Sequence, residues 1–183
     1  MTRLLLIALP LLSLSACDTG RKVEGENAAV AEVAEKVAAV NADAPRFRPG
    51  KWASTTTIEA LEIPGMPPEA AEYQKKMMRG IATGIESCLT PEQAARPNEG
   101  FFAGQEGNCR YDRYSAEAGK LSAVMRCGSG DSAQLVEFEG SFAPEQYELR
   151  MVSKAEGPAA RTMTMKINAR RIGECDDKAA PAR

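Results

Sequence analysis

The sequence predicts an α+β fold. Its main part is an antiparallel β meander that forms a curved sheet or partial barrel, with one helix packed on it, a short capped helix and two disulfides. The first observation is the alternation of apolar and polar residues over 134–142, 147–153 and 161–172, which is the period of strands with one dry face. The second is a helical pattern of apolar residues after a Pro-rich break at 63–68.

The first strand is expected over residues 52–63, where threonine and apolar residues dominate. One of its faces should carry Trp52, Thr56, Ile58 and Ala60. A helix over 69–83 then follows, and we expect its apolar stripe to pack on the sheet. The residues of that stripe are Ala70, Tyr73, Met77 and Ile81.

The middle of the chain contains a short strand over 85–89 and a second helix. Thr90 and Gln93 have the spacing of a capping box with Pro91 at the first helical position, so a helix begins here. The glycine-rich residues 98–108 lack the Gly-Lys-Ser/Thr ending of a phosphate loop. We interpret them as a surface loop whose phenylalanines fold back onto the core.

Residues 109–127 are expected to form a β-hairpin with a three-residue loop at 117–119, in which Gly119 takes the left-handed conformation. In this register Cys109 opposes Cys127 at a non-hydrogen-bonded site, where a disulfide can close across the ladder. Arg110 opposes Arg126, which is unfavourable unless Asp112 contributes. The same register pairs Ser115 with Leu121, Arg113 with Ala123 and Tyr111 with Met125.

The N-terminus has the pattern of an export signal, because Arg3 precedes an apolar run at 4–14 that is too short to span a bilayer. Leu14-Ser15-Ala16-Cys17 resembles a bacterial lipobox, in which the cysteine thiol is lipidated and becomes the first mature residue. We therefore expect a periplasmic protein, lipid-anchored to the inner or outer membrane through Cys17. Asp18 resembles a signal for retention at the inner membrane.

With Cys17 assigned to lipid, four of the five cysteines remain, and an even number in an exported chain indicates two disulfides. After the hairpin pair, Cys88 and Cys175 pair by elimination. The alternative, a zinc site, needs closely spaced pairs such as Cys-x-x-Cys, which the sequence lacks.

These patterns divide the chain into four parts. They are a signal peptide (1–16), a lipidated cysteine with an Ala/Glu-rich tether (17–44), a globular disulfide-bonded domain (45–176) and a disordered tail (177–183). Within the tether, Val30, Val33, Val37 and Val40 have heptad spacing over only about two heptads. A partly helical tether is therefore favoured over a docking or self-pairing helix.

Composition argues against several functions. A net charge of −2 without a long basic run is unlike that of nucleic-acid binders. The absence of histidine removes the commonest general base and the commonest transition-metal ligand. We expect no cofactor, no metal and no enzymatic activity. Glu137 and Glu139 would project together from one strand, as acid/base pairs do, but this spacing is typical of a solvated face.

Several segments resemble a family of exported bacterial proteins grouped as domain of unknown function 3617. They are Pro49-Gly50-Lys51-Trp52, Cys88-Leu89-Thr90-Pro91-Glu92-Gln93-Ala94-Ala95-Arg96-Pro97, the Cys109 and Cys127 pair, and Arg171-Ile172-Gly173-Glu174-Cys175. The resemblance covers residues 45–176. It implies an exported, often lipid-anchored envelope protein without an assigned activity, and it supplies no catalytic residues.

Two functions follow from these observations. One is a non-enzymatic envelope module that binds or supports an unknown envelope protein. The other is a carrier or sensor of a small apolar ligand such as a lipid, which requires a cavity of a few hundred Å³. The carrier hypothesis depends on methionines that core packing also explains. These candidate ligand contacts are Met77, Met125, Met151, Met163 and Met165.

Overall fold

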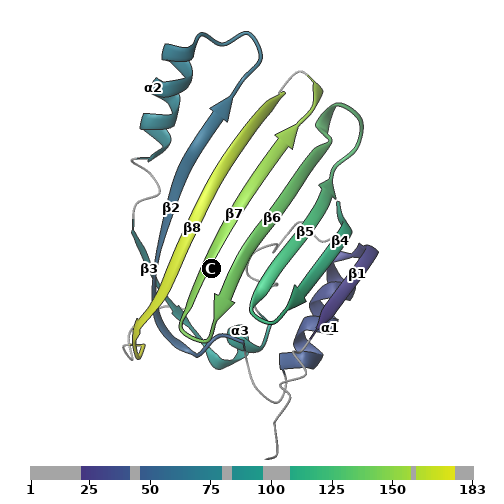
Figure 1. Cartoon of the computed structure of the whole chain (residues 1–183), viewed down its shortest axis with the longest axis vertical. Coiled ribbons are helices and arrows are strands. Elements are labelled where there is room, and N and C mark those ends of the chain that lie inside the picture. The colour runs from purple at the N-terminus through teal and green to yellow at the C-terminus, as the bar shows by residue number, and fades with distance from the viewer. Residues whose placement is uncertain (1–21, 42–45, 80–83, 97–107, 158–159, 176–183) are drawn as a thin grey trace, which may run out of the picture.

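The computed structural model describes residues 22–41, 46–79, 84–96, 108–157 and 160–175. Its strands form one open, eight-stranded antiparallel sheet in the order β1-β4-β5-β6-β7-β8-β2-β3 (Figure 1). The strands are β1 (Val23–Ala29), β2 (Gly50–Glu62), β3 (Ile85–Leu89), β4 (Cys109–Glu117), β5 (Lys120–Cys127), β6 (Gln134–Ala143), β7 (Gln146–Ala155) and β8 (Arg161–Gly173). The helices are α1 (Val30–Asn41), α2 (Pro68–Arg79) and α3 (Pro91–Ala95), with a 3₁₀ turn at Gly130–Ser132. The predicted α+β class and curved meander are confirmed.

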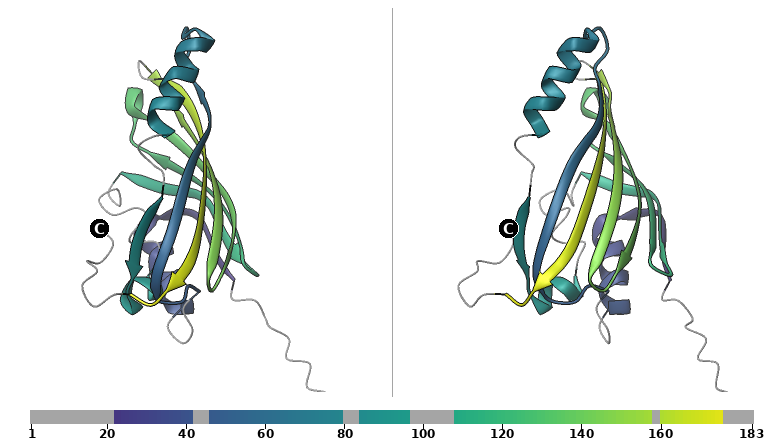
Figure 2. Two further views of the ribbon diagram at one scale, coloured as in Figure 1. Left: turned by 90° about the vertical axis from the view of Figure 1, so that its left-hand side faces the viewer. Right: turned by 60° about the vertical axis from the view of Figure 1, so that its left-hand side comes forward.

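The sheet has an apolar inner face and a polar outer face, as the alternation predicted. The inner face contributes Met125, Val136, Phe138 and Leu149 to the buried core. The outer face carries ion pairs between strands. Lys154–Glu137 at 2.8 Å and Lys166–Glu148 at 2.9 Å join neighbouring strands, and Arg150–Glu59 at 3.2 Å joins β7 to β2 across β8. Figure 2 shows the sheet from its side, with the three helices on one side of it.

Residues 23–41 are part of the folded sheet and its core, which corrects the tether expected over 17–44. β1 pairs antiparallel with β4, so that Val23 opposes Ala116 and Ala28 opposes Tyr111. Val33 and Val37 on α1 are 0% and 1% exposed. The valine spacing therefore marks a helix that packs on the protein's own sheet. The structure does not describe Cys17 and the signal peptide.

Truncating Val33 tests this correction. We expect Val33→Ala to lower the free energy of unfolding by about 1 to 3 kcal/mol, because it removes two buried methyl groups and leaves a cavity. Chemical denaturation measures the change. Glu35→Ala on the exposed side of the same helix is the control and should cost less than about 0.5 kcal/mol. Equal stability of the two variants would support a tether.

Along β2, the residues that point to the inner face change from even-numbered to odd-numbered positions part of the way along the strand. Trp52 and Ile58 are buried as expected, but Leu61 and not Ala60 continues the face. The reason is a register shift between Ile58 and Ala60, which leaves Glu59 as an extra residue relative to β8.

The β4–β5 hairpin has a tighter turn than predicted. Ala118 and Gly119 form a two-residue loop in which both φ angles are positive, at 48° and 75°. Near the turn the register is therefore shifted by one residue. Ser115 opposes Ser122, and Arg113 opposes Val124, so the predicted partners Leu121 and Ala123 are wrong.

A bulge then corrects the register further along the hairpin. The register shifts between Tyr111 and Arg113, which adds Asp112 to β4 and restores the predicted pairing of Tyr111 with Met125. Cys109 opposes Cys127 and forms the predicted disulfide, with a Cα–Cα distance of 4.0 Å. Asp112 also bonds Arg126 at 2.7 Å, which offsets the repulsion between Arg126 and Arg110.

Helix α2 lies at one end of the sheet, beside the last part of β2 at the edge (Figure 1). The prediction that its stripe packs on the sheet is wrong, because Tyr73 and Met77 are 66% and 59% exposed. Ala70 of the predicted stripe is half-buried, together with Ala71 and Lys75. Hydrophobic periodicity does not specify the surface against which a helix packs. Here α2 follows the turn at 63–67, and none of its described side chains belongs to the buried core cluster. Ile81 and the loop phenylalanines at 101 and 102 lie outside the described residues.

Candidate functional site

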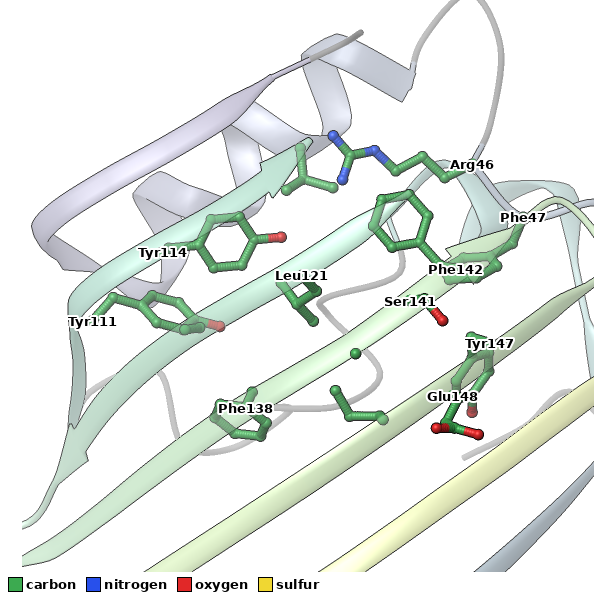
Figure 3. Close-up of a pocket in the computed structure, with 14 residues that line it drawn as sticks. Arg46, Phe47, Tyr111, Tyr114, Leu121, Phe138, Ser141, Phe142, Tyr147 and Glu148 are labelled. Carbon is green, nitrogen blue, oxygen red and sulfur yellow. The ribbon is translucent and has the colours of Figure 1, made fainter. Parts of the chain in front are cut away.

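A cavity of about 90 Å³ lies on the inner face of the sheet, beside Val37 of α1 (Figure 3). Most of its lining is aromatic or aliphatic. Tyr111, Tyr114 and Phe138 line one part of it, and Phe47, Phe142 and Tyr147 line another. For comparison, an apolar cavity of about 150 Å³ holds one benzene. This cavity can therefore take the end of a chain or a small side chain, but it falls short of the few hundred Å³ expected for a whole ligand.

The two β4 tyrosines reach the cavity because of the bulge at Asp112. Tyr111 and Tyr114 are an odd number of residues apart and would point to opposite faces of a regular strand. With the extra residue between them, both are buried on the inner face, and their ring centroids are 5.2 Å apart. The bulge that restores the hairpin register thus also builds one wall of the cavity.

The other wall is an aromatic cluster from the segment before β2 and from the β6–β7 hairpin. Phe47 precedes β2, and Phe142 near the end of β6 opposes Tyr147 near the start of β7. The Phe47 ring centroid lies 6.1 Å from that of Phe142 and 5.6 Å from that of Tyr147. These edge-to-face contacts are a favourable geometry for aromatic rings.

Arg46 places a cation beside these apolar groups. The guanidinium carbon of Arg46 is 5.0 Å from the ring centroid of Phe142, within the range of a cation–π interaction. Figure 3 shows its side chain reaching across Phe142 toward the side of the cavity where Tyr114 lies. The site thus combines an apolar interior with one positive charge at its rim.

Tyrosine hydroxyls supply the other polar groups of the interior. Burial raises the pKa of Tyr111 above its usual value, and the neighbouring Tyr114 adds to the shift. Burial also raises the pKa of Tyr147. Both phenols therefore stay protonated at neutral pH, where they can donate hydrogen bonds.

The structure brings together three of the five candidate methionines. Met151 on β7 opposes Met165 on β8. Met163 lies two residues before Met165 in β8 and therefore on the same face. These three side chains are half-buried. Met125 is only 2% exposed and belongs to the core, whereas Met77 lies on the exposed side of α2. None of the five is among the described residues that line the cavity.

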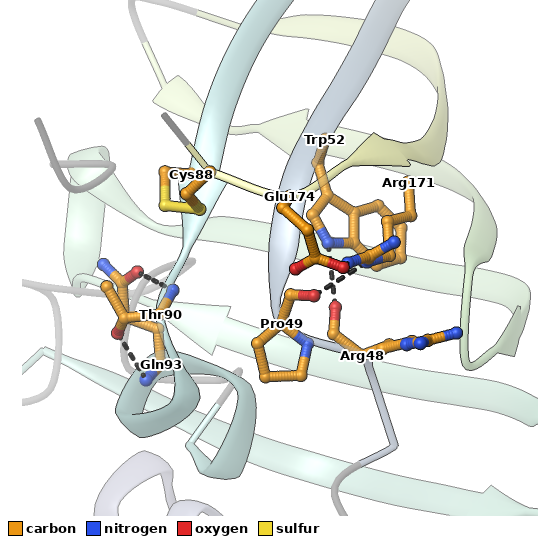
Figure 4. Close-up of a disulfide and its surroundings, with 9 residues drawn as sticks. Arg48, Pro49, Trp52, Cys88, Thr90, Gln93, Arg171 and Glu174 are labelled. Carbon is orange, nitrogen blue, oxygen red and sulfur yellow. Dashed lines mark hydrogen bonds and ion pairs between the residues drawn. A yellow bond between two sulfur atoms is a disulfide. The ribbon is translucent and has the colours of Figure 1, made fainter. Parts of the chain in front are cut away.

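The segment that carries Arg46 and Phe47 is held by a group that we call the clasp, formed by Arg48, Pro49, Trp52, Arg171 and Glu174 (Figure 4). Arg171 Nε donates to the Pro49 carbonyl at 2.7 Å, and Trp52 Nε1 donates to the Arg48 carbonyl at 3.1 Å. Arg171 also bonds Glu174 and holds the pKa of that carboxyl below its usual range. The clasp joins the start of β2 to the end of β8.

The second disulfide and the capped helix lie beside the clasp. Cys88 bonds Cys175 with a Cα–Cα distance of 5.5 Å, as predicted by elimination. The capping box is also confirmed, because the Gln93 amide donates to Thr90 Oγ1 at 3.2 Å and the Thr90 amide donates to Gln93 Oε1 at 3.0 Å. At the end of α3, Asn41 of α1 donates to the Ala95 carbonyl at 3.4 Å, which connects the two helices.

Glu137 and Glu139 line a shallow hollow of about 350 Å³ on the outer face, together with Asp112, Arg113 and Arg126. Two of these carboxylates are paired with cations, since Glu137 bonds Lys154 at 2.8 Å and Asp112 bonds Arg126 at 2.7 Å. The described residues contain no cluster of three or more acidic, cysteine or histidine side chains suited to a metal ion. The geometry resembles a surface ion-pair network.

These features define the class of protein: a disulfide-bonded α+β domain with an open antiparallel sheet and an aromatic cavity under a helix. A family model described as protein of unknown function (DUF3617) matches residues 47–175, and the chain belongs to that family. The match includes both disulfides and most of the residues around the cavity, while β1 and α1 precede it. No curated protein and no solved structure matches the chain. In the described part of the chain, no helix has the length and apolar character needed to cross a membrane.

Proposed function

We propose that the protein is a non-enzymatic binding module of the bacterial cell envelope, held at a membrane by a lipid on Cys17. In this proposal, the aromatic cavity receives an apolar group of another envelope component. The cavity carries the proposal, because a mostly apolar space with a few polar or charged groups, here including Arg46 and Glu148, is a common form of binding site. Its volume fits an anchoring side chain or a chain end.

The location of the protein is part of the proposal. The lipobox-like residues Leu14 to Cys17 support a lipid anchor, and the two disulfides suit an oxidising compartment such as the periplasm. The lack of histidine in the sequence supports a non-enzymatic role.

Replacing the proposed lipid acceptor tests the anchor. We expect Cys17→Ser to release the exported chain into the soluble periplasmic fraction, because the acyl chains that would hold it at the membrane are missing. Fractionation followed by immunoblotting measures this. Ser15→Ala in the same segment keeps a small residue before the cysteine and should stay membrane-bound. A Cys17→Ser protein that has lost residues 1–16 and still remains with the membrane would contradict the lipid anchor.

A carrier or sensor of a small apolar ligand such as a lipid is the second candidate. Its support is the apolar strip of Met151, Met163 and Met165 next to the cavity on the inner face. The two candidates differ in what is bound when the protein is isolated.

Native mass spectrometry with organic extraction distinguishes them, using the whole mature chain with Cys17→Ser exported to an oxidising periplasm. A bound apolar molecule supports the carrier. An empty protein with two intact disulfides, and reproducible photo-crosslinking of one envelope protein from position 47 in the native envelope, supports the partner-binding module. An empty protein that crosslinks to nothing would contradict both.

A further inference from the structure

This inference rests on the proposed apolar binding site. The charge at the rim of the cavity and the length of the apolar surface next to it together define a class of ligand. Arg46 places a guanidinium at the rim of the cavity, where an anion would find a charged donor beside an aromatic ring. Among the described residues, Glu148 is the one carboxylate that lines the cavity, and Lys166 bonds it at 2.9 Å. The rim therefore favours an anionic group over a cationic one.

Apolar side chains continue from the cavity along the inner face. Leu149, which lines the cavity, opposes Ile167. The next inner-face pair along the strands is Met151 with Met165, and the pair after that contains Met163. From Ala169 to Met163, six residues of β8 span about 20 Å at ~3.4 Å per residue. Ile167 and these three methionines are half-buried, so this strip can cover one side of an extended chain.

The cavity lies near the point where the described chain begins. Val23 opposes Ala116, which opposes Leu121 of the cavity wall, so Val23 and Leu121 are about 10 Å apart at ~4.8 Å per strand. Phe142 is at the same end, because its amide donates to the Gly119 carbonyl at 2.7 Å. Four residues lie between Cys17 and Lys22, and the five residue-to-residue steps of an extended chain span at most about 18 Å. The proposed anchor thus keeps the site close to the membrane.

From this arrangement we infer that the site binds a single-chain anionic amphiphile of the membrane, such as a fatty acid. Its head group pairs with Arg46. The first part of its tail fills the aromatic cavity, and the rest lies along the strip of Met151, Met163 and Met165. The small volume of the cavity then limits only the part of the tail next to the head group, while the remainder lies on the half-buried strip.

Titration with dodecanoate and dodecan-1-ol tests this inference, because the two probes share a tail and differ in charge. Trp52 is the only tryptophan in the chain, and its ring lies 6.0 Å from that of Tyr147 and 5.8 Å from that of Phe47. Its fluorescence therefore reports on the cavity. In the whole mature chain with Cys17→Ser, we expect one dodecanoate per chain and about tenfold weaker binding of the alcohol.

Two variants locate the interaction. Arg46→Gln should remove the preference for dodecanoate, so that the two probes bind with equal affinity. The matched control is Arg48→Gln on the same segment. The Arg48 side chain pairs with Glu145 at 2.9 Å and does not line the cavity, and the backbone carbonyl by which Arg48 takes part in the clasp is kept in the variant. Ala123→Leu adds a larger side chain to the cavity wall and should weaken both probes, with thermal melting used to verify that the variant is folded.

The outcomes separate the inference from the proposed function. Equal affinity for the two probes, or an unchanged preference in Arg46→Gln, overturns the anionic amphiphile and leaves an apolar site in place. Binding that Ala123→Leu does not weaken in a folded protein overturns the location of the tail. If neither probe binds while a partner protein crosslinks at position 47, the inference fails and the partner-binding function stands.

Discussion

Replacement of Cys88 and Cys175 together by alanine should lower the free energy of unfolding by about 4 to 5 kcal/mol. The two residues are 87 apart in sequence, so the crosslink closes a long loop and restricts the unfolded chain strongly. Alanine is the suitable replacement because Cys88 is buried beside the clasp. Denaturant unfolding of the oxidised proteins measures the difference.

The other disulfide provides the matched comparison. Cys109 and Cys127 are 18 residues apart, and the same chain-entropy argument gives about 3 kcal/mol for their replacement by alanine. The order of the two losses is the critical result. A larger loss for the hairpin pair would mean that native contacts around Cys109, and not restriction of the unfolded chain, dominate its contribution.

Gly50→Ala should destabilise the protein by about 3 kcal/mol or more, adding backbone strain of ~1–3 kcal/mol to a similar cost of overpacking. Gly50 has a φ of 137°, a conformation that residues with a side chain rarely adopt. A Cβ at this position would lie 2.5 Å from both the Gly173 carbonyl oxygen and Arg171 Nε. The backbone carbonyl cannot move as a side chain can, so the clasp must open.

Gly173→Ala is the control for this prediction. Gly173 lies opposite β2 at the same end of the sheet, and a Cβ there would meet no atom within 4 Å. We expect a change of less than about 1 kcal/mol in the free energy of unfolding. Thermal melting of both variants measures the two effects. Similar losses of stability in Gly50→Ala and Gly173→Ala would contradict the steric argument, which predicts a large loss only at Gly50. Because the clasp also holds the segment of Phe47, Gly50→Ala should in addition lower the Trp52 fluorescence response to dodecanoate.

The strands of the meander could be predicted from the sequence because each of them buries one face. Alternation then carries the information directly, as in 134–142, where Val136 and Phe138 are buried and Glu139 is exposed. The pairing register of the β4–β5 hairpin was harder to predict. Its turn was predicted with one residue too many and its bulge was missed, and the two errors cancelled at Cys109. A bulge has no local sequence signal, since Asp112 adopts its place only because of the pairing on either side.

The sequence did not predict that β1 and α1 belong to the folded domain, for a different reason. The segment Val23–Ala29 contains Gly25 and Asn27, and Asn27 has a positive φ, so it has neither the composition nor the regularity of a typical strand. A twelve-residue helix such as α1 is marginal in water by itself. Both elements depend on tertiary contacts with Tyr111 and Tyr114, which local patterns do not contain.

The aromatic cavity could not be predicted from spacing either. Phe47, Tyr111 and Phe142 come from separate parts of the chain, and only the completed sheet brings them together. The methionine pattern indicated an apolar inner face, which is correct, but it did not locate the enclosed part of that face. The residues next to Arg46 in the sequence form no motif that would have marked it as part of a binding site.

The position of β1 at the edge of the sheet has a mechanical consequence. A pulling force on the N-terminal end acts first on the ladder between β1 and β4, because Val23 is the first residue of that ladder. If β1 detaches, the force passes through α1 and the segment after it to the clasp. The Cys109–Cys127 bond keeps β4 covalently attached to β5 throughout. Under tension the protein should therefore lengthen first by release of residues 23–41, with the remaining strands still paired.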